Sequence, residues 1–99
     1  MPGTLLDAYV LETLMADLVG HDRKVSAFLV YLYLFHHSAR SRGRRLSLSY
    51  ARIAEETGLS KSAAQDAVRH LKRRGLVSSR RAHTTAVPEY TVLRPWRRN

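Results

Sequence analysis

The sequence contains no cysteine, only three prolines and five glycines among its 99 residues, and no long apolar run. The absence of cysteine excludes disulfide bonds and thiolate metal sites, and it suits the reducing cytoplasm. The longest apolar run, from Val25 to Phe35, is about half as long as a membrane-spanning helix requires. We therefore expect a cytoplasmic protein with one modest core and no membrane segment.

Motifs for catalysis and cofactor binding are also missing. The chain has no glycine-rich phosphate loop, no zinc-ligand spacing and no nucleophile elbow. His36 and His37 are adjacent, so they cannot chelate a metal from one helical face. Glu55 and Glu56 point about 100° apart on a helix, so they do not form an acid–base pair. The sequence predicts neither an enzyme nor a metal or cofactor site.

Basic residues are abundant and unevenly distributed, with a net charge of +9. Residues 1–39 hold two Lys or Arg against four Asp or Glu, a net of −2, whereas residues 40–99 hold fifteen against four, a net of +11. A polyanion partner is expected, because Lys and Arg that neutralise phosphates release condensed counterions. An anionic membrane surface would require a basic amphipathic helix with bulky apolar residues, and none is evident.

Two short helices joined by a turn are predicted between Leu48 and Val77. Ser49 and Ser60 stand where N-cap oxygens are needed, and Gly58 and Gly75 stand where the helices must end. Each helix has one narrow face of apolar or small residues at i, i+3, i+4 and i+7: Tyr50, Ile53, Ala54 and Thr57 in the first, and Ala64, Ala67, Val68 and Leu71 in the second. The sequence therefore predicts a helix-turn-helix.

The second helix, about residues 60–74, leaves a polar face for a partner: Lys61, Ser62, Gln65, Asp66, Arg69 and Arg73. In a major groove Arg suits guanine and Gln suits adenine. We predict base contacts from Ser62, Gln65 and Arg69, with Asp66 either orienting Arg69 or accepting a hydrogen bond from cytosine. A merely solvated helix face is the alternative, because charged outer faces are common.

Gly58-Leu59-Ser60, His70-Leu71-Lys72 and Arg74-Gly75-Leu76-Val77 resemble the winged helix-turn-helix of bacterial regulators of the GntR and MarR types. Over roughly residues 22–93 the chain also resembles the helix-turn-helix module of plasmid and phage replication initiators. The resemblance implies a winged fold and a role in transcriptional regulation or replication initiation. Such families usually have a Thr and a β-branched residue where this chain has Ala63 and Ala64, so Ser62 and Lys61 are left to contact phosphate there.

The N-terminal third is predicted to form two helices. Thr4 and Asp7 have capping-box spacing for a helix over about residues 5–19, which Gly20 should end. The helix has a wide apolar face, which is compatible both with covering the core and with forming a dimer arm. This face comprises Leu6, Val10, Leu14 and Leu18, with Leu11 and Met15 beside them. Asp22 is the predicted N-cap of a second, almost wholly apolar helix that continues to His37.

Short strands are expected over residues 46–48, 76–80 and 89–93, with residues 81–88 as the wing loop. The wing residues are Arg80, Arg81, His83, Thr84 and Thr85. The predicted contacts to the DNA backbone are Ser49, Arg52, Ser60, Lys61, Arg73, Arg40, Arg42, Arg44 and Arg45. The last four belong to residues 38–45, for which a flexible solvated loop is the alternative. Trp96, flanked by Arg94, Arg97 and Arg98, is expected to pack on the domain rather than on a base.

We predict a mainly α-helical winged helix-turn-helix: a three-helix core, an N-terminal helix and a two- to three-stranded antiparallel sheet. In the predicted domain division, the segment of the N-terminal helix comprises residues 1–21 and the winged helix-turn-helix domain residues 22–99. The predicted function is sequence-specific binding of double-stranded DNA as a homodimer, with no small-molecule ligand evident. A protein–protein interaction module within a larger assembly is the alternative. RNA binding is a weaker one, because the chain lacks an exposed aromatic platform.

Overall fold

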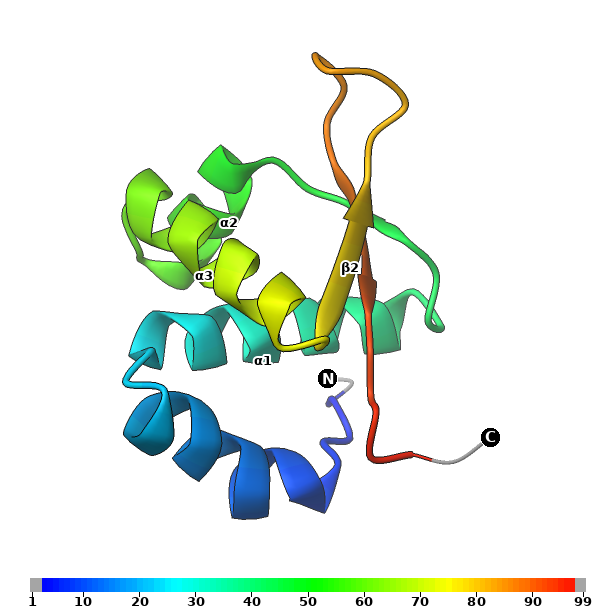
Figure 1. The fold of residues 1–99 in the computed structure, drawn as a ribbon. Coiled ribbons are helices and arrows are strands. Elements are labelled where there is room, and N and C mark those ends of the chain that lie inside the picture. Colours follow the sequence, from blue (N-terminus) through cyan, green and yellow to red (C-terminus); the bar gives the residue numbers. More distant parts are fainter. Residues whose placement is uncertain (1–2, 98–99) are drawn as a thin grey trace.

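A computed structural model describes residues 3–97 (Figure 1). Along the sequence, the helical elements precede the last two strands. An N-terminal helix over residues 8–21 contains the segments η1 (Val10–Leu14) and η2 (Ala16–His21). The elements that follow are α1 (Val25–Arg40), β1 (Leu46–Ser47), α2 (Tyr50–Thr57), α3 (Lys61–Arg73), β2 (Val77–Arg80) and β3 (Glu89–Val92). The strands pair antiparallel in the order β1-β3-β2. The predicted winged helix-turn-helix is confirmed.

The ends of α2 and α3 follow from local sequence. Ser49 Oγ accepts the Arg52 N–H at 3.1 Å, and Ser60 Oγ accepts the Ala63 N–H at 3.0 Å. Gly58 and Gly75, with φ of 81° and 70°, take the chain out of the two helices. Beyond Gly75, the Leu76 N–H donates to the Leu71 carbonyl at 3.0 Å. This capping bond occupies the Leu76 amide, so β2 begins at Val77.

The central helix α1 lies between the helix-turn-helix and the N-terminal helix (Figure 1). Tyr31 is fully buried in it, and its hydroxyl donates to the Leu93 carbonyl at 2.9 Å. Burial raises the pKa of Tyr31, so the hydroxyl stays neutral. On α3, Ala64 and Ala67 are fully buried, and their small side chains let the neighbouring helices approach closely.

The start of the N-terminal helix differs from the prediction. Thr4 and Asp7 form no capping box: Thr4 Oγ1 is hydrogen-bonded to His36 Nδ1, and the Asp7 carboxylate accepts from Trp96 Nε1 at 2.8 Å and from Arg97 Nε at 2.7 Å. Distant partners thus take both side chains that local spacing assigned to a cap. The helix begins at residue 8 rather than 5 and passes through Gly20 to His21, since Gly20 keeps a negative φ.

The same helix is wound more widely than an α-helix. The Met15 N–H donates to the Val10 carbonyl, five residues back. In an α-helix, side chains four positions apart point about 40° away from each other around the helix axis. The wider turn reduces that angle. Val10, Leu14 and Leu18 consequently share one buried face. Leu11 and Met15, expected to widen that face, are instead 51% and 41% exposed.

Asp22 does not cap the next helix, because Lys24 occupies the N-cap position of α1. The Asp22 side chain is only 7% exposed, and it bonds to His70 Nε2 at 2.8 Å and to His21 Nδ1 at 2.9 Å. Arg74 Nε lies 3.1 Å from the same carboxylate. Asp22 therefore ties the segment before α1 to the end of α3.

The end of α1 and the C-terminal segment were also predicted from the sequence. Helix α1 continues to Arg40, so the predicted loop over residues 38–45 begins at residue 41. Trp96 packs on the domain as expected, stacked on Tyr9 with ring centroids 4.6 Å apart. Arg94 lies over the Phe35 ring, and Arg98 falls outside the described residues. Between residues 3 and 97, none of the helices is long and apolar enough to cross a membrane.

Candidate nucleic-acid interface

Helix α3 presents the predicted base-contact residues to solvent. Ser62, Gln65 and Arg69 are exposed at i, i+3 and i+7, and Arg73 extends the same stripe by one turn. The opposite face of the helix is buried and consists of Ala64, Ala67, Val68 and Leu71. Burial of that inner face determines which side of α3 remains open to a partner. Helix α3 and the wing lie on the same side of α1 (Figure 1).

Asp66, beside this stripe, already has a partner. Lys24 Nζ lies 2.9 Å from Asp66 Oδ2, whereas Arg69 Nη1 is 4.0 Å from Oδ1. The hydrogen bond from Lys24 lowers the pKa of Asp66 and keeps it ionised. Lys24 is thus the closer partner, and sequence reasoning missed it. No local signal could have found this contact, because the two residues are 42 positions apart.

A groove of about 240 Å³ joins the first turns of α2 and α3 to the wing. Its lining comprises Ser49, Tyr50, Ala51, Lys61, Arg81, Thr85, Ala86, Val87 and Pro88. Ser49 and Lys61 were predicted as phosphate contacts, and Arg81 and Thr85 as wing residues. The fold brings these four together from three separate segments. With two cationic side chains and the positive end of α2, the groove suits a phosphate group.

The wing loop is held by hydrogen bonds of its own. Arg81 Nη1 donates to the Thr84 carbonyl at 3.1 Å, and Thr85 Oγ1 lies 2.9 Å from His83 Nδ1. These four residues are all exposed. At the base of the wing, Arg80 Nε lies 3.5 Å from the Glu89 carboxylate, which reduces the positive charge there. Arg81, the first residue after β2, forms no salt bridge with another residue in the range 3–97, so its positive charge is not offset.

The remaining predicted backbone contacts on α2 and α3 have structural roles as well. The hydroxyls of Ser49 and Ser60 accept backbone bonds in the caps, and each retains a proton that can be donated to phosphate. Arg52 Nε lies 3.4 Å from the Glu56 carboxylate, which also accepts from the Tyr33 hydroxyl. Burial, together with this bond to Glu56, raises the pKa of Tyr33 to about 12.

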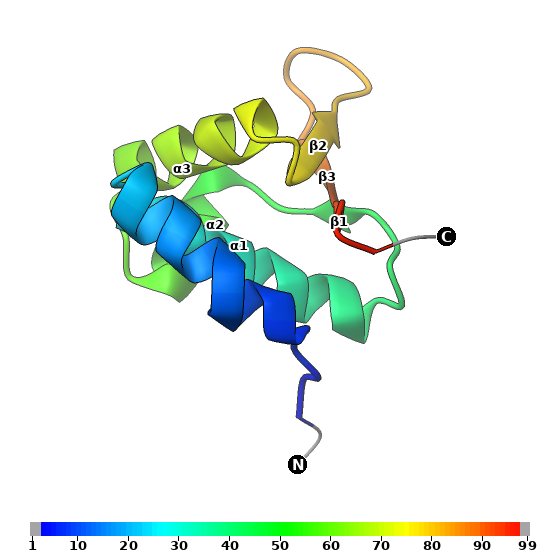
Figure 2. The same ribbon diagram turned by 60° about the horizontal axis from the view of Figure 1, so that its bottom comes forward.

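The structure does not bring Arg40, Arg42 and Arg44 to this face. Arg45 reaches the base of the wing, where its Nη1 lies 4.0 Å from the Glu89 carboxylate that also pairs with Arg80. Leu46 pairs with Tyr90 and Ser47 with Glu89, so the chain preceding β1 leads away from the wing. Figures 1 and 2 both place this loop far from the wing tip. The four arginines and Ser41 surround a separate hollow of about 370 Å³.

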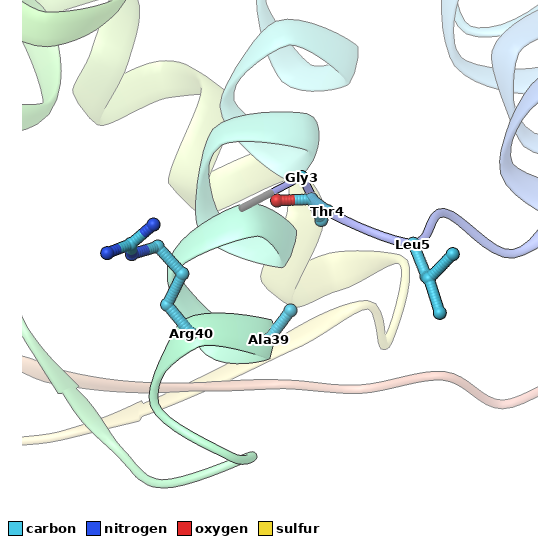
Figure 3. Close-up of a pocket in the computed structure, with 5 residues that line it drawn as sticks. All are labelled: Gly3, Thr4, Leu5, Ala39 and Arg40. Carbon is cyan, nitrogen blue, oxygen red and sulfur yellow. The ribbon is translucent and has the colours of Figure 1, made fainter. Parts of the chain in front are cut away.

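Another hollow, of about 430 Å³, lies between the N-terminal segment and the end of α1 (Figure 3). Its lining residues are Gly3, Thr4, Leu5, Ala39 and Arg40. Arg40 and Leu5 point to opposite sides in this view, so charged and apolar groups do not converge on a ligand. Over residues 3–97 there is also no group of three or more His, Cys, Asp or Glu that could hold a metal ion.

Comparison with known proteins connects this geometry to a family. A helix-turn-helix domain family matches residues 24–77, from the N-cap of α1 to the first residue of β2. The chain belongs to this helix-turn-helix domain family. Membership indicates DNA binding, and the matched segment contains the whole exposed stripe of α3. Searches of curated proteins and of solved structures found no match.

Proposed function

We propose that the protein binds specific sequences of double-stranded DNA by placing α3 in the major groove. The observation that carries this proposal is the exposed stripe of Ser62, Gln65 and Arg69 on α3. Three donor-bearing side chains on one helical face are what successive base edges require. Arg69 can bind guanine through two hydrogen bonds, and Gln65 can bind adenine in the same manner.

The groove between α2, α3 and the wing supports the same orientation. Lys61 of α3 and Arg81 of the wing both line it, and a phosphate held there would fix the register of α3 on the duplex. The wing then follows the backbone or enters the neighbouring minor groove, where Arg is the preferred residue. The biological role that we propose is transcriptional regulation or replication initiation.

We further propose that the protein acts as a homodimer that binds half-sites about one helical turn apart. Leu11 and Met15 support this, because they are exposed apolar side chains on the N-terminal helix. That helix lies across α1 from α3 (Figure 1), so pairing through it leaves both recognition helices free.

Selection of the purified chain on a randomised duplex library at near-physiological salt tests the proposal. Enrichment of an inverted repeat is expected, and its position at a promoter or at an origin then separates regulation from initiation. Salt-sensitive retention of every duplex without enrichment would contradict sequence specificity. Retention of no duplex at all would contradict DNA binding.

A further inference from the structure

Arg40, the last residue of α1, and the loop that follows it, together called the arginine loop, concentrate positive charge outside the α3 face. Arg40, Arg42, Arg44 and Arg45 are all exposed within six residues. Only Arg45 has a carboxylate within 4.0 Å among residues 3–97, that of Glu89. Three arginines are therefore held close together without an acidic neighbour in the part of the chain described.

The backbone of this loop is ordered by hydrogen bonds. The Gly43 N–H donates to the Ser38 carbonyl at 2.8 Å, and the Arg44 N–H donates to the Ser41 carbonyl at 3.2 Å. Arg42 and Gly43 both have positive φ, of 56° and 78°, which turns the chain sharply after α1. Because the amide groups are used inside the loop, the guanidinium groups are what it offers to a partner.

The chemistry of the hollow favours phosphates over a folded protein. Its lining consists only of arginines and Ser41, with no apolar side chain. Protein interfaces have an apolar core with aromatic anchors, which this surface lacks. The planar fork of Arg matches a phosphate through two parallel hydrogen bonds, so a cluster of arginines suits a nucleic-acid backbone.

We propose that this loop holds a second segment of double-stranded DNA, so that one protein molecule bridges two duplexes. The inference rests on the proposed function, because α3 and the wing hold the first duplex. The domain measures 37 × 29 × 29 Å, and DNA is stiff over about 150 base pairs. One short duplex on α3 therefore does not bend around the domain to reach the loop.

A capture experiment tests the bridge. A 20-base-pair duplex is immobilised and saturated with the full 99-residue chain, and a second, fluorescent duplex of the same length is added. The variant carries Arg40→Ala, Arg42→Ala and Arg44→Ala, and it leaves Arg45 with Glu89. We expect the variant to bind the first duplex within about threefold of the original affinity, and to capture about tenfold less of the second, because phosphate neutralisation is lost.

A matched variant with Lys at the same three positions keeps the charge, so it should retain most of the capture. Equal circular dichroism and thermal midpoints exclude misfolding. The bridge is refuted if the unaltered chain binds the first duplex and captures no second one. If the Ala variant captured the second duplex as well as the unaltered chain does, the second duplex would be bound by another copy of the protein and not by the loop. If the Ala variant lost binding of the first duplex as strongly as capture of the second, the loop would belong to the α3 interface.

Two further results would also overturn the bridge. Equal retention of a fluorescent polyglutamate peptide in place of the second duplex would identify an acidic protein segment as the partner. Failure of the unaltered chain to bind even the first duplex would overturn the proposed function as well, and the first-duplex signal reports that failure separately.

Discussion

Arg69 and Arg81 are both exposed arginines, but they occupy different parts of the proposed interface. Arg69 lies on the base-contact stripe of α3, and Arg81 lines the groove at the wing. We expect Arg69→Ala to cost about 1–3 kcal/mol of binding free energy at the selected site and to relax base preference at one position. Arg81→Ala should weaken binding evenly on all sequences. Competition binding with specific and random duplexes measures both, and equal losses for Arg69→Ala would contradict base contact.

Asp22 provides a prediction about stability. Its hydrogen bonds with His21 and then His70 hold the pKa of the carboxyl below its ordinary value. Asp22→Asn should reduce the free energy of unfolding by about 1–3 kcal/mol at pH 7, because it weakens charge-assisted bonds to a nearly buried group. A depressed folded-state pKa stabilises the fold above the unfolded pKa, and that stabilisation is lost as the pH falls through the folded value.

Urea unfolding of both proteins between pH 7 and pH 2 measures this difference. The gap in unfolding free energy between the unaltered chain and the Asp22→Asn variant should close as the pH falls from about 5 to about 2. A gap that widens over that acid range would show that Asp22 does not act as a stabilising carboxylate.

At the scale of elements, replacing two helix glycines by Ala is expected to change the free energy of unfolding in opposite directions. Gly58 leaves α2 with φ of 81°, and a Cβ there meets nothing within 4 Å, so only backbone strain opposes Gly58→Ala. We expect that change to destabilise by about 1–2 kcal/mol. Gly20 lies inside a helix with negative φ and equally open space, so Gly20→Ala should stabilise by about 0.5–1 kcal/mol. Thermal unfolding compares them, and a neutral Gly58→Ala would argue against the left-handed turn.

Elements defined by local interactions were predictable, and those that depend on distant partners were not. Ser49 and Ser60 cap their helices through amides three residues away, so the chain needs no tertiary information there. Thr4 and Asp7 have equally good local spacing, but His36, Trp96 and Arg97 compete for them successfully. A capping bond contributes about 1 kcal/mol, which a charge-assisted contact can exceed.

For the whole molecule, the proposed homodimer makes Met15 a useful probe. Met15→Lys places a charge in the exposed apolar strip, and it should weaken self-association by at least about tenfold, or 1.4 kcal/mol. Leu5→Lys is the control, because Leu5 is 93% exposed and lies outside the helix. Analytical ultracentrifugation with and without the selected DNA measures both variants. A chain that is monomeric at micromolar concentration under both conditions would rule out the dimer.

The amino-acid sequence by itself determined the helix-turn-helix, its caps and the outward stripe of α3, because helical periodicity and capping act within about one turn. Only the tertiary structure decided which segments share a face. The return of β3 between β1 and β2 brings Arg81 and Lys61 to one groove and directs the loop before β1, with Arg42 and Arg44, away from the wing. Lys24 meets Asp66, and Asp22 meets His70, across more than 40 residues. Such contacts arise from packing α1 against α3, which no local pattern along the chain encodes.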